Sequence, residues 1–174
     1  TWTYESDIPF FDCSSGYDFL GVRDISNTPL EYAPLSANIL NETDLQSACG
    51  TSGEATISFP GLATTTDLSA HSSVTLTFDY DVEGYNANTD EAHYELFYNG
   101  VAQGRVVLQT GSTPGDDAEG TVNVNIPDSV TSLRLEIILR NNGGGHAGFD
   151  NFLLQGVPSA VATLDLANLG GQIN

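Results

Sequence analysis

The sequence predicts an all-β protein, a single antiparallel β-sandwich with roughly eight or nine short strands. Apolar and polar residues alternate in short segments along the chain, and a period of two is typical of a strand with one buried face. Gly, Asn, Asp and Pro separate these segments, as turn residues do. No segment has the longer apolar period of an amphipathic helix.

The alternating segments, in chain order, are 55–59, 73–82, 92–98, 105–110, 121–126, 132–139 and 149–156. Within 73–82, the apolar residues from Val74 to Val82 share one face, and Asp79 and Asp81 share the other. The dipeptide Asn99-Gly100 predicts a hairpin, because both central residues of a type I′ turn need positive φ. In 132–139, alternation directs Arg134 and Glu136 outward, where they can pair weakly.

The remaining segments are less regular. Residues 5–54 contain several prolines and many Ser and Asn residues, so we expect mostly loops there. Residues 1–157 are assigned to the sandwich. Residues 158–174 follow Val157 and form a C-terminal tail, which is either a linker or an extra strand.

Two cysteines, Cys13 and Cys49, fall in the less regular region. A disulfide between them would close a loop of about 35 residues and stabilise the fold by on the order of 3 to 4 kcal/mol. Two free thiols are the alternative. We favour the disulfide, because the acidic, lysine-free composition suggests an exported protein.

The charge of the chain is strongly one-sided. It has 23 acidic residues and four basic ones, all arginines, for a net charge of −19. Such a chain repels nucleic-acid phosphates and anionic membrane surfaces, and it has no apolar run near the roughly 18 residues that span a membrane. We therefore expect no nucleic-acid partner and no membrane insertion. Dense carboxylates favour solubility outside the cell and attract Ca²⁺.

Three segments carry a resemblance to known domains: YDFLGVRD (17–24), TTDLSAHSSVTLTFDY (65–80) and AGFDNFLLQGV (147–157). They resemble MAM-like and galactose-binding-like jelly-roll domains of bacterial secreted proteins, which include many carbohydrate-binding modules. The resemblance covers most of residues 17–157. It implies a non-catalytic binding module that is secreted or displayed at the cell surface.

The resemblance also implies a structural calcium ion, held by Asp150 together with an acidic residue near the first strands, for which Asp12, Asp18 and Asp24 are the candidates. An ionised carboxylate within an apolar strand pattern is costly unless it is paired, hydrogen-bonded or bound to metal. Asp150 is therefore a calcium ligand, an acceptor of backbone N–H groups, or a carboxylate on the solvent side of its strand.

Four residues are candidates for a ligand site. Tyr85 offers a ring that can stack on a sugar if it is exposed. Asp90 and Glu91 offer oxygens to sugar hydroxyls or to an ion, although an ordinary polar hairpin end is the alternative. His146 lines a groove near Asp150 or lies in solvent in a turn. No zinc-binding spacing and no serine-hydrolase elbow occur, so we expect no enzyme.

Together these observations predict an extracellular, calcium-stabilised module that binds carbohydrate or a cell surface. The alternative is a structural subunit of an extracellular filament or surface layer, in which copies of the chain exchange strands. Its donor strand would be 159–170, a part of the tail with small and apolar residues.

Overall fold

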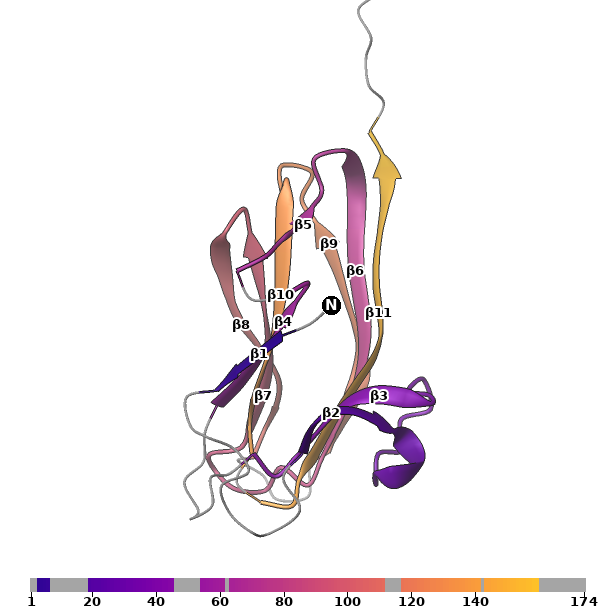
Figure 1. Ribbon diagram of the computed structural model, residues 1–174, viewed down its shortest axis with the longest axis vertical. Coiled ribbons are helices and arrows are strands. Elements are labelled where there is room, and N and C mark those ends of the chain that lie inside the picture. The colour runs from indigo at the N-terminus through magenta and orange to yellow at the C-terminus, as the bar shows by residue number, and fades with distance from the viewer. Residues whose placement is uncertain are drawn as a thin grey trace, which may run out of the picture.

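The fold was obtained as a computed structural model. It describes residues 3–6, 19–45, 54–61, 63–111, 117–141 and 143–159. These residues form two antiparallel sheets packed face to face (Figure 1). The predicted all-β antiparallel sandwich is confirmed. Within the described residues, no helix is long and apolar enough to cross a membrane.

The first layer, sheet A, has the strand order β1-β4-β10-β7-β8, and β5 pairs with one end of β10. Its strands are β1 (Thr3–Ser6), β4 (Glu54–Phe59), β5 (Thr66–Asp67), β7 (Glu91–Tyr98), β8 (Val101–Thr110) and β10 (Ser132–Arg140). The hairpin between β7 and β8 turns at Asn99 and Gly100, whose φ angles are 51° and 80°. Both are positive, as the sequence predicts for this turn.

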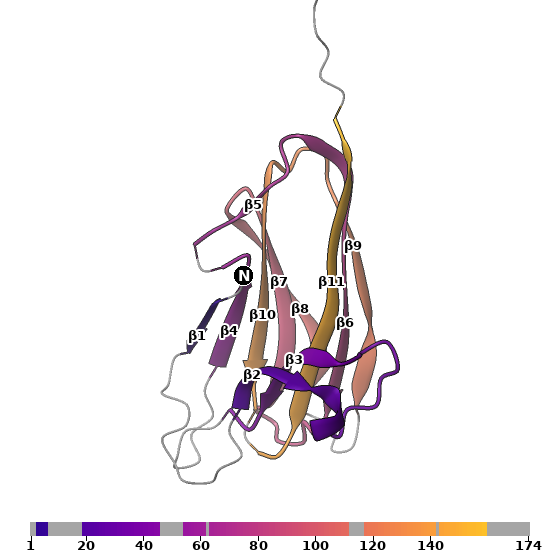
Figure 2. The same ribbon diagram turned by 45° about the vertical axis from the view of Figure 1, so that its right-hand side comes forward.

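The second layer, sheet B, has the order β2-β3-β11-β6-β9. Its strands are β2 (Phe19–Asp24), β3 (Asn38–Thr43), β6 (His71–Glu83), β9 (Ala118–Ile126) and β11 (His146–Pro158). The two long strands β6 and β11 form its centre. The short strands β2 and β3 lie beside only the lower part of β11 (Figures 1 and 2).

All seven alternating segments of the sequence are strands, but the described residues contain four further strands, β1, β2, β3 and β5. These are two to six residues long. So short a segment shows little periodicity, and it is stabilised by the neighbour it pairs with rather than by its own sequence. The expectation of mostly loops in residues 5–54 is therefore too strong.

The core lies between the two sheets and is rich in aromatic side chains. Phe78 of β6 packs edge-on against Tyr94 of β7, with ring centroids 5.6 Å apart. Phe59 of β4 stacks on Phe152 of β11 at 4.6 Å. Such pairs add to the stabilisation from burial, and each of these joins sheet A to sheet B.

A second, smaller apolar cluster lies outside the main core. Leu30, Leu35 and Ile39 form it, and the segment between β2 and β3 supplies the two leucines. Gly148 of β11 leaves room for them, because a Cβ there would lie 2.4 Å from Leu30 Cδ1. The β2–β3 segment thus covers part of the outer face of sheet B, where Asp79 and Asp81 become buried.

Candidate functional site

Tyr85 does not form an exposed platform for a sugar. Its side chain is 1% exposed, and its hydroxyl donates a 2.6 Å hydrogen bond to Glu42 Oε2. Gly84, at φ 69°, turns the chain directly after β6. The expectation of an exposed Tyr85 is therefore wrong, because an acceptor on β3, distant in sequence, holds its hydroxyl inside the fold.

Glu42 is the centre of a buried polar cluster. Its second carboxylate oxygen accepts a 2.9 Å hydrogen bond from Asn141 Nδ2, which also donates to Gly145 O at 2.8 Å. Burial raises the pKa of Glu42 to about 8, against the hydrogen bonds from Tyr85 and Asn141. Burial also raises the pKa of Tyr85, and the nearby Glu42 adds to this. The cluster is inside the protein and does not reach a dissolved ligand.

The other three ligand candidates lie in different places. Asp90 is buried, and its Oδ2 accepts a 2.9 Å hydrogen bond from the Ala87 N–H within a turn. His146 is half-buried on β11, with Nδ1 2.9 Å from Thr43 Oγ1. Glu91 begins β7, where its register partner is Arg140. The four residues do not form one pocket, and Glu91 alone belongs to the surface described below.

Asp150 lies on the outer face of sheet B, opposite Asp79 of β6. Its Oδ2 accepts a 3.3 Å hydrogen bond from the backbone N–H of Ser36. The neighbouring Asn151 donates to Pro34 O and to Asp79 Oδ2, each at 2.8 Å. In the structure Asp150 and Asn151 therefore anchor the β2–β3 segment, which agrees with the hydrogen-bonding interpretation of Asp150.

The expected partners of Asp150 in a calcium site do not gather around it. Asp24 caps the 3₁₀ turn η1 (Ile25–Asn27), and hydrogen bonds from the Ser26 hydroxyl and N–H lower its pKa. Asp12, Asp18, Cys13 and Cys49 lie outside the described residues. Among the residues that the structure describes, no three His, Cys, Asp or Glu side chains form a group suited to a metal ion. Asp150 and Asp24 by themselves thus do not make a calcium site.

The outer face of sheet A gathers most of the positive charge of the chain. Alternation sends the apolar residues of β4, β7 and β10 into the core and their polar neighbours to the opposite side. We call this side the outer face of sheet A. It is formed by Glu54, Thr56, Ser58, Glu91, His93, Glu95, Phe97, Arg105, Arg134, Glu136, Ile138 and Arg140. It therefore holds three of the four basic residues of the chain.

The ion pair between Arg105 and Glu54 crosses this face. The two guanidinium nitrogens of Arg105 donate to the two carboxylate oxygens of Glu54 at 2.7 and 2.8 Å. Arg105 is on β8 and Glu54 on β4, with β7 and β10 between them. Arg140 adds a second contact to Glu54 at 3.6 Å. A planar, bidentate pair has a fixed geometry, so these side chains are held over the middle of the sheet.

Beneath this ion pair, the central strands are shielded from water. His93 and Ile138 are register partners on β7 and β10, and both are buried although they point away from the core. Burial lowers the pKa of His93, and Arg105 and Arg140 add to this, while Glu91 and Glu54 oppose it. The net shift favours the neutral imidazole. Its Nδ1 and the Ser58 hydroxyl lack a hydrogen-bond partner among the described residues.

The other end of the outer face combines a ring with a cation. The Arg134 guanidinium lies over the ring of Phe97, with Cζ 4.0 Å from the ring centroid. The same guanidinium contacts Glu136 at 3.0 Å, so the pair predicted from alternation is confirmed. Glu95 accepts a 3.1 Å hydrogen bond from the Gly104 N–H. The face thus presents both hydrogen-bond donors and acceptors, beside an aromatic ring.

The outer face of sheet A was not among the sites expected from the sequence. The sequence did contain evidence for this face. The outward positions of 92–98 and 132–139 are mostly charged or polar, and two of the four arginines, Arg134 and Arg140, lie in residues 132–140. The contribution of Arg105 could not be seen, because its partner Glu54 is distant in sequence and pairs only after β4 and β8 join one sheet.

Comparisons with known proteins bear on the fold. No protein-family model matches the chain, and no curated protein matches it in sequence. Solved structures are similar, however. One is TmCBM61 in complex with β-1,4-galactotriose, with a TM-score of 0.54, 12% identity, 90% of this chain covered and 88% of that one.

Two further solved structures are more distant. A carbohydrate-binding module of the β-sandwich superfamily gives a TM-score of 0.48 at 10% identity, over 88% of this chain and 56% of that chain. The K3 cleaved adhesin domain of Lys-gingipain from Porphyromonas gingivalis W83 gives 0.42 at 11% identity, over 87% and 99%. By its fold, the chain is similar to the β-sandwich of the carbohydrate-binding module TmCBM61.

Proposed function

We propose that the protein is a non-catalytic module that binds a neutral carbohydrate on the outer face of sheet A. The observation that carries the proposal is the concentration of Arg105, Arg134 and Arg140 on one face of a chain whose net charge is −19. Elsewhere the described surface is predominantly acidic or uncharged. We infer that the three arginines are gathered on this face because they contact a ligand there.

The chemistry of the face suits hydroxyl groups. Each arginine has five N–H donors, and each glutamate offers lone pairs on two oxygens. A sugar hydroxyl both donates and accepts, so it can bridge neighbouring Arg and Glu side chains such as Arg105 and Glu54. The face carries Glu54, Glu91, Glu95 and Glu136 beside its three arginines. Its charge is nearly balanced, which favours a neutral ligand over an anionic one.

The β8 side of the face also provides apolar surface. Val107 of β8 is 57% exposed and is the register partner of His93, so it lies beside the residues that define the face. Sugar rings have one apolar face that packs on such groups. An extracellular or cell-surface location accords with this ligand and with the acidic composition.

A structural calcium ion is a separate part of the proposal. Asp150 is available as one carboxylate ligand, and the resemblance implies a second near the first strands. Asp79 is the register partner of Asp150, but no group of three possible ligands forms among the described residues, so a complete site would need a residue outside them, such as Asp18. No contact of the sugar on sheet A depends on this ion.

Glycan binding tests the proposal directly. We expect the purified full chain to bind neutral oligosaccharides on an array, with β-1,4-galactotriose as the first probe for calorimetry, since TmCBM61 has been solved with that ligand. Substituting Arg105 with Ala is expected to weaken binding by about tenfold or more. Arg23→Ala is the matched control, because Arg23 lies on sheet B over the Phe19 ring. Unchanged binding by the Arg105 variant would remove the outer face of sheet A from the proposal.

A further inference from the structure

Strand β11 has an unpaired edge. It pairs with β6 as far as Pro158, but with β3 only from His146 to Phe149. Beyond Phe149, no strand among the described residues pairs with its other side. Figures 1 and 2 show β2 and β3 at the lower end of β11, and Figure 1 shows no strand beside its upper part on the side away from β6. Backbone N–H and C=O groups of this upper stretch are therefore available to another strand.

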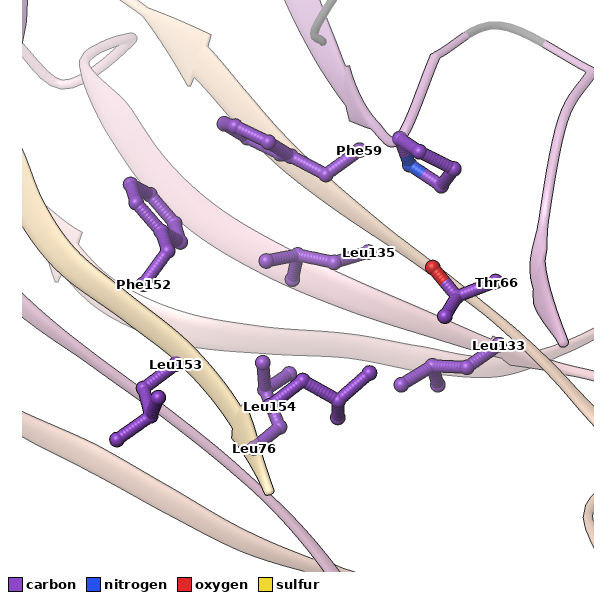
Figure 3. Close-up of a pocket in the computed structure, with 9 residues that line it drawn as sticks. Phe59, Thr66, Leu76, Leu133, Leu135, Phe152, Leu153 and Leu154 are labelled. Atoms are coloured by element: carbon purple, nitrogen blue, oxygen red, sulfur yellow. The ribbon is translucent and has the colours of Figure 1, made fainter. Parts of the chain in front are cut away.

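A groove lies behind this edge, where the two sheets separate, and it is apolar at one end and lined by polar residues such as Asp67 and His71 at the other. One part is a cavity of about 170 Å³ lined by residues that include Phe59 of β4, Leu135 of β10 and Phe152 of β11 (Figure 3). A second cavity of about 440 Å³ continues from it along β11 and reaches His71. Thr66 and Leu154 line both cavities, so together they form one groove, which we call the β11 groove.

The edge beside the β11 groove carries no charge over residues 152–157, although β11 has two register shifts against β6 in its upper part. Exposed edges of natural sheets are blocked by charged residues, prolines, β-bulges or a covering segment. The edge strand β8 carries Arg105, and the edge strand β9 carries Glu119. By contrast, residues 152–157 contain no charge, and Leu153 and Val157 are 47% and 58% exposed. In a chain with 23 acidic residues, an uncharged apolar edge of this length is unusual.

We propose that the β11 groove accepts residues 160–169 of a second copy of this chain, as an added strand along the free edge of β11. The sequence of this segment has the required pattern. In an extended strand, one face would carry Ala160, Ala162, Leu164, Leu166 and Asn168, and the other Val161, Thr163, Asp165, Ala167 and Leu169. Such a strand would present its more apolar face to the groove and its mixed face, with Thr163 and Asp165, to water.

The position of the tail brings it to this groove. The Ser159 N–H donates a 2.8 Å hydrogen bond to Ala70 O, next to His71 at the far end of the larger cavity. To enter the groove of its own molecule, the chain would have to reverse directly after Pro158. Residues 159–163 contain no Gly, Asn or Asp, the residues that two-residue hairpin turns favour. We therefore assign the tail to the groove of a neighbouring copy, and repetition of this contact would give a linear assembly.

Paired variants of the full chain test the assignment. Leu164→Asp with Leu166→Asp blocks the donor strand, and Leu153→Lys places a charge on the acceptor edge. Val101→Lys is the matched control, because Val101 is 64% exposed on the edge strand β8. By light scattering over a range of protein concentrations, we expect the unmodified chain and the control to form concentration-dependent assemblies. Each blocked variant alone should be a monomer.

Mixing the two blocked variants tests whether the tail occupies the groove of a second copy or its own groove. The Leu153→Lys variant keeps an intact tail, which should enter the intact groove of the Leu164→Asp, Leu166→Asp variant. The mixture should therefore form one-to-one dimers and nothing larger. In the opposite outcome, the unmodified chain is monomeric at every concentration, while the Leu164→Asp and Leu166→Asp substitutions lower the melting temperature. That result would place the tail in the groove of its own molecule and overturn the second-copy assignment. If neither blocked variant changes assembly or melting, the tail is not the occupant and the proposal fails. None of these outcomes depends on glycan binding.

Discussion

Arg105 on β8 and Glu54 on β4 form a bidentate ion pair, at 2.7 and 2.8 Å, that spans the two central strands of sheet A. The pair covers His93 and holds two polar groups in fixed positions on the proposed sugar-binding face. Its side chains are partly exposed, at 43% for Arg105 and 21% for Glu54. Surface pairs of this kind contribute little to folding, so its role can be separated from stability.

Substituting Arg105 with Ala should therefore affect binding more than folding. We expect the free energy of unfolding to change by less than about 1 kcal/mol, while the affinity for the bound oligosaccharide falls by about tenfold or more. Urea unfolding and calorimetry measure the two quantities. Arg105→Lys keeps the charge but loses the bidentate geometry, and it should recover only part of the affinity. Parallel losses of stability and affinity would mean that the pair has a structural role alone.

Glu42 predicts how stability depends on pH. Its pKa is about 8 in the folded protein, against an ordinary value of 4.5 for a glutamate in water, so between these values the folded state holds a proton that the unfolded state has released. Stability is then greatest below the unfolded pKa and decreases as pH rises from about 4.5 to about 8, by at most about 1.4 kcal/mol per pH unit.

Glu42→Gln should remove this pH dependence, because the amide does not titrate. Urea unfolding of both proteins from pH 5 to pH 8 measures it. We expect a falling free energy of unfolding for the unmodified chain and a flatter curve for the variant. The exposed Glu119 provides the control substitution Glu119→Gln, which should follow the unmodified chain. Identical slopes for all three proteins would show that Glu42 titrates normally.

Gly111 is expected to tolerate no side chain. A Cβ at this position would lie 2.0 Å from the Ala87 carbonyl oxygen and 2.9 Å from its carbon, and backbone atoms cannot move aside cheaply. The Gly111 N–H also donates to Asp90 O at 2.8 Å. Gly111→Ala should therefore destabilise the fold by about 1 to 3 kcal/mol. At Gly144 a Cβ meets nothing within 4 Å, so Gly144→Ala should leave the melting temperature unchanged or slightly raised.

Calcium binding is tested by melting temperature in calcium and in chelator. If Asp150 is a ligand, millimolar calcium raises the melting temperature and Asp150→Asn abolishes the rise, because a ligand that binds only the folded state stabilises it. Asp24→Asn should leave the rise intact, since the Asp24 carboxylate already caps η1 through Ser26. A melting temperature independent of calcium in the unmodified chain would leave Asp150 as an anchor for the β2–β3 segment only.

Sequence reasoning identified the long strands because their pattern is local. The alternation from Val74 to Val82 places Phe78 in the core whatever the neighbours of β6 are, and the turn at Asn99-Gly100 needs only its own two residues. The pair Arg134–Glu136 could be foreseen for the same reason. The strands that were missed, such as β5, depend on pairing with a distant partner.

The candidate sites depended on tertiary contacts in a way that the sequence did not reveal. The polar segment around Tyr85 and Asp90 looks like an exposed turn in the sequence. In the structure both residues are buried, and Glu42 accepts a hydrogen bond from Tyr85 and another from Asn141. Asp150 was correctly singled out as a carboxylate that needs partners. Only the structure showed that its partner is the Ser36 N–H. Ser36 reaches Asp150 because the β2–β3 segment crosses the outer face of sheet B.

The sequence by itself determined that the chain is a two-layer antiparallel sandwich with an acidic surface, because strand periodicity and charge composition are properties of neighbouring residues and of their sum. Tertiary structure alone decided that Arg105 meets Glu54 and that β11 keeps an unpaired edge beside a groove that is apolar at one end. Both depend on strand order and register, and these arise only when segments far apart in the chain pack against one another.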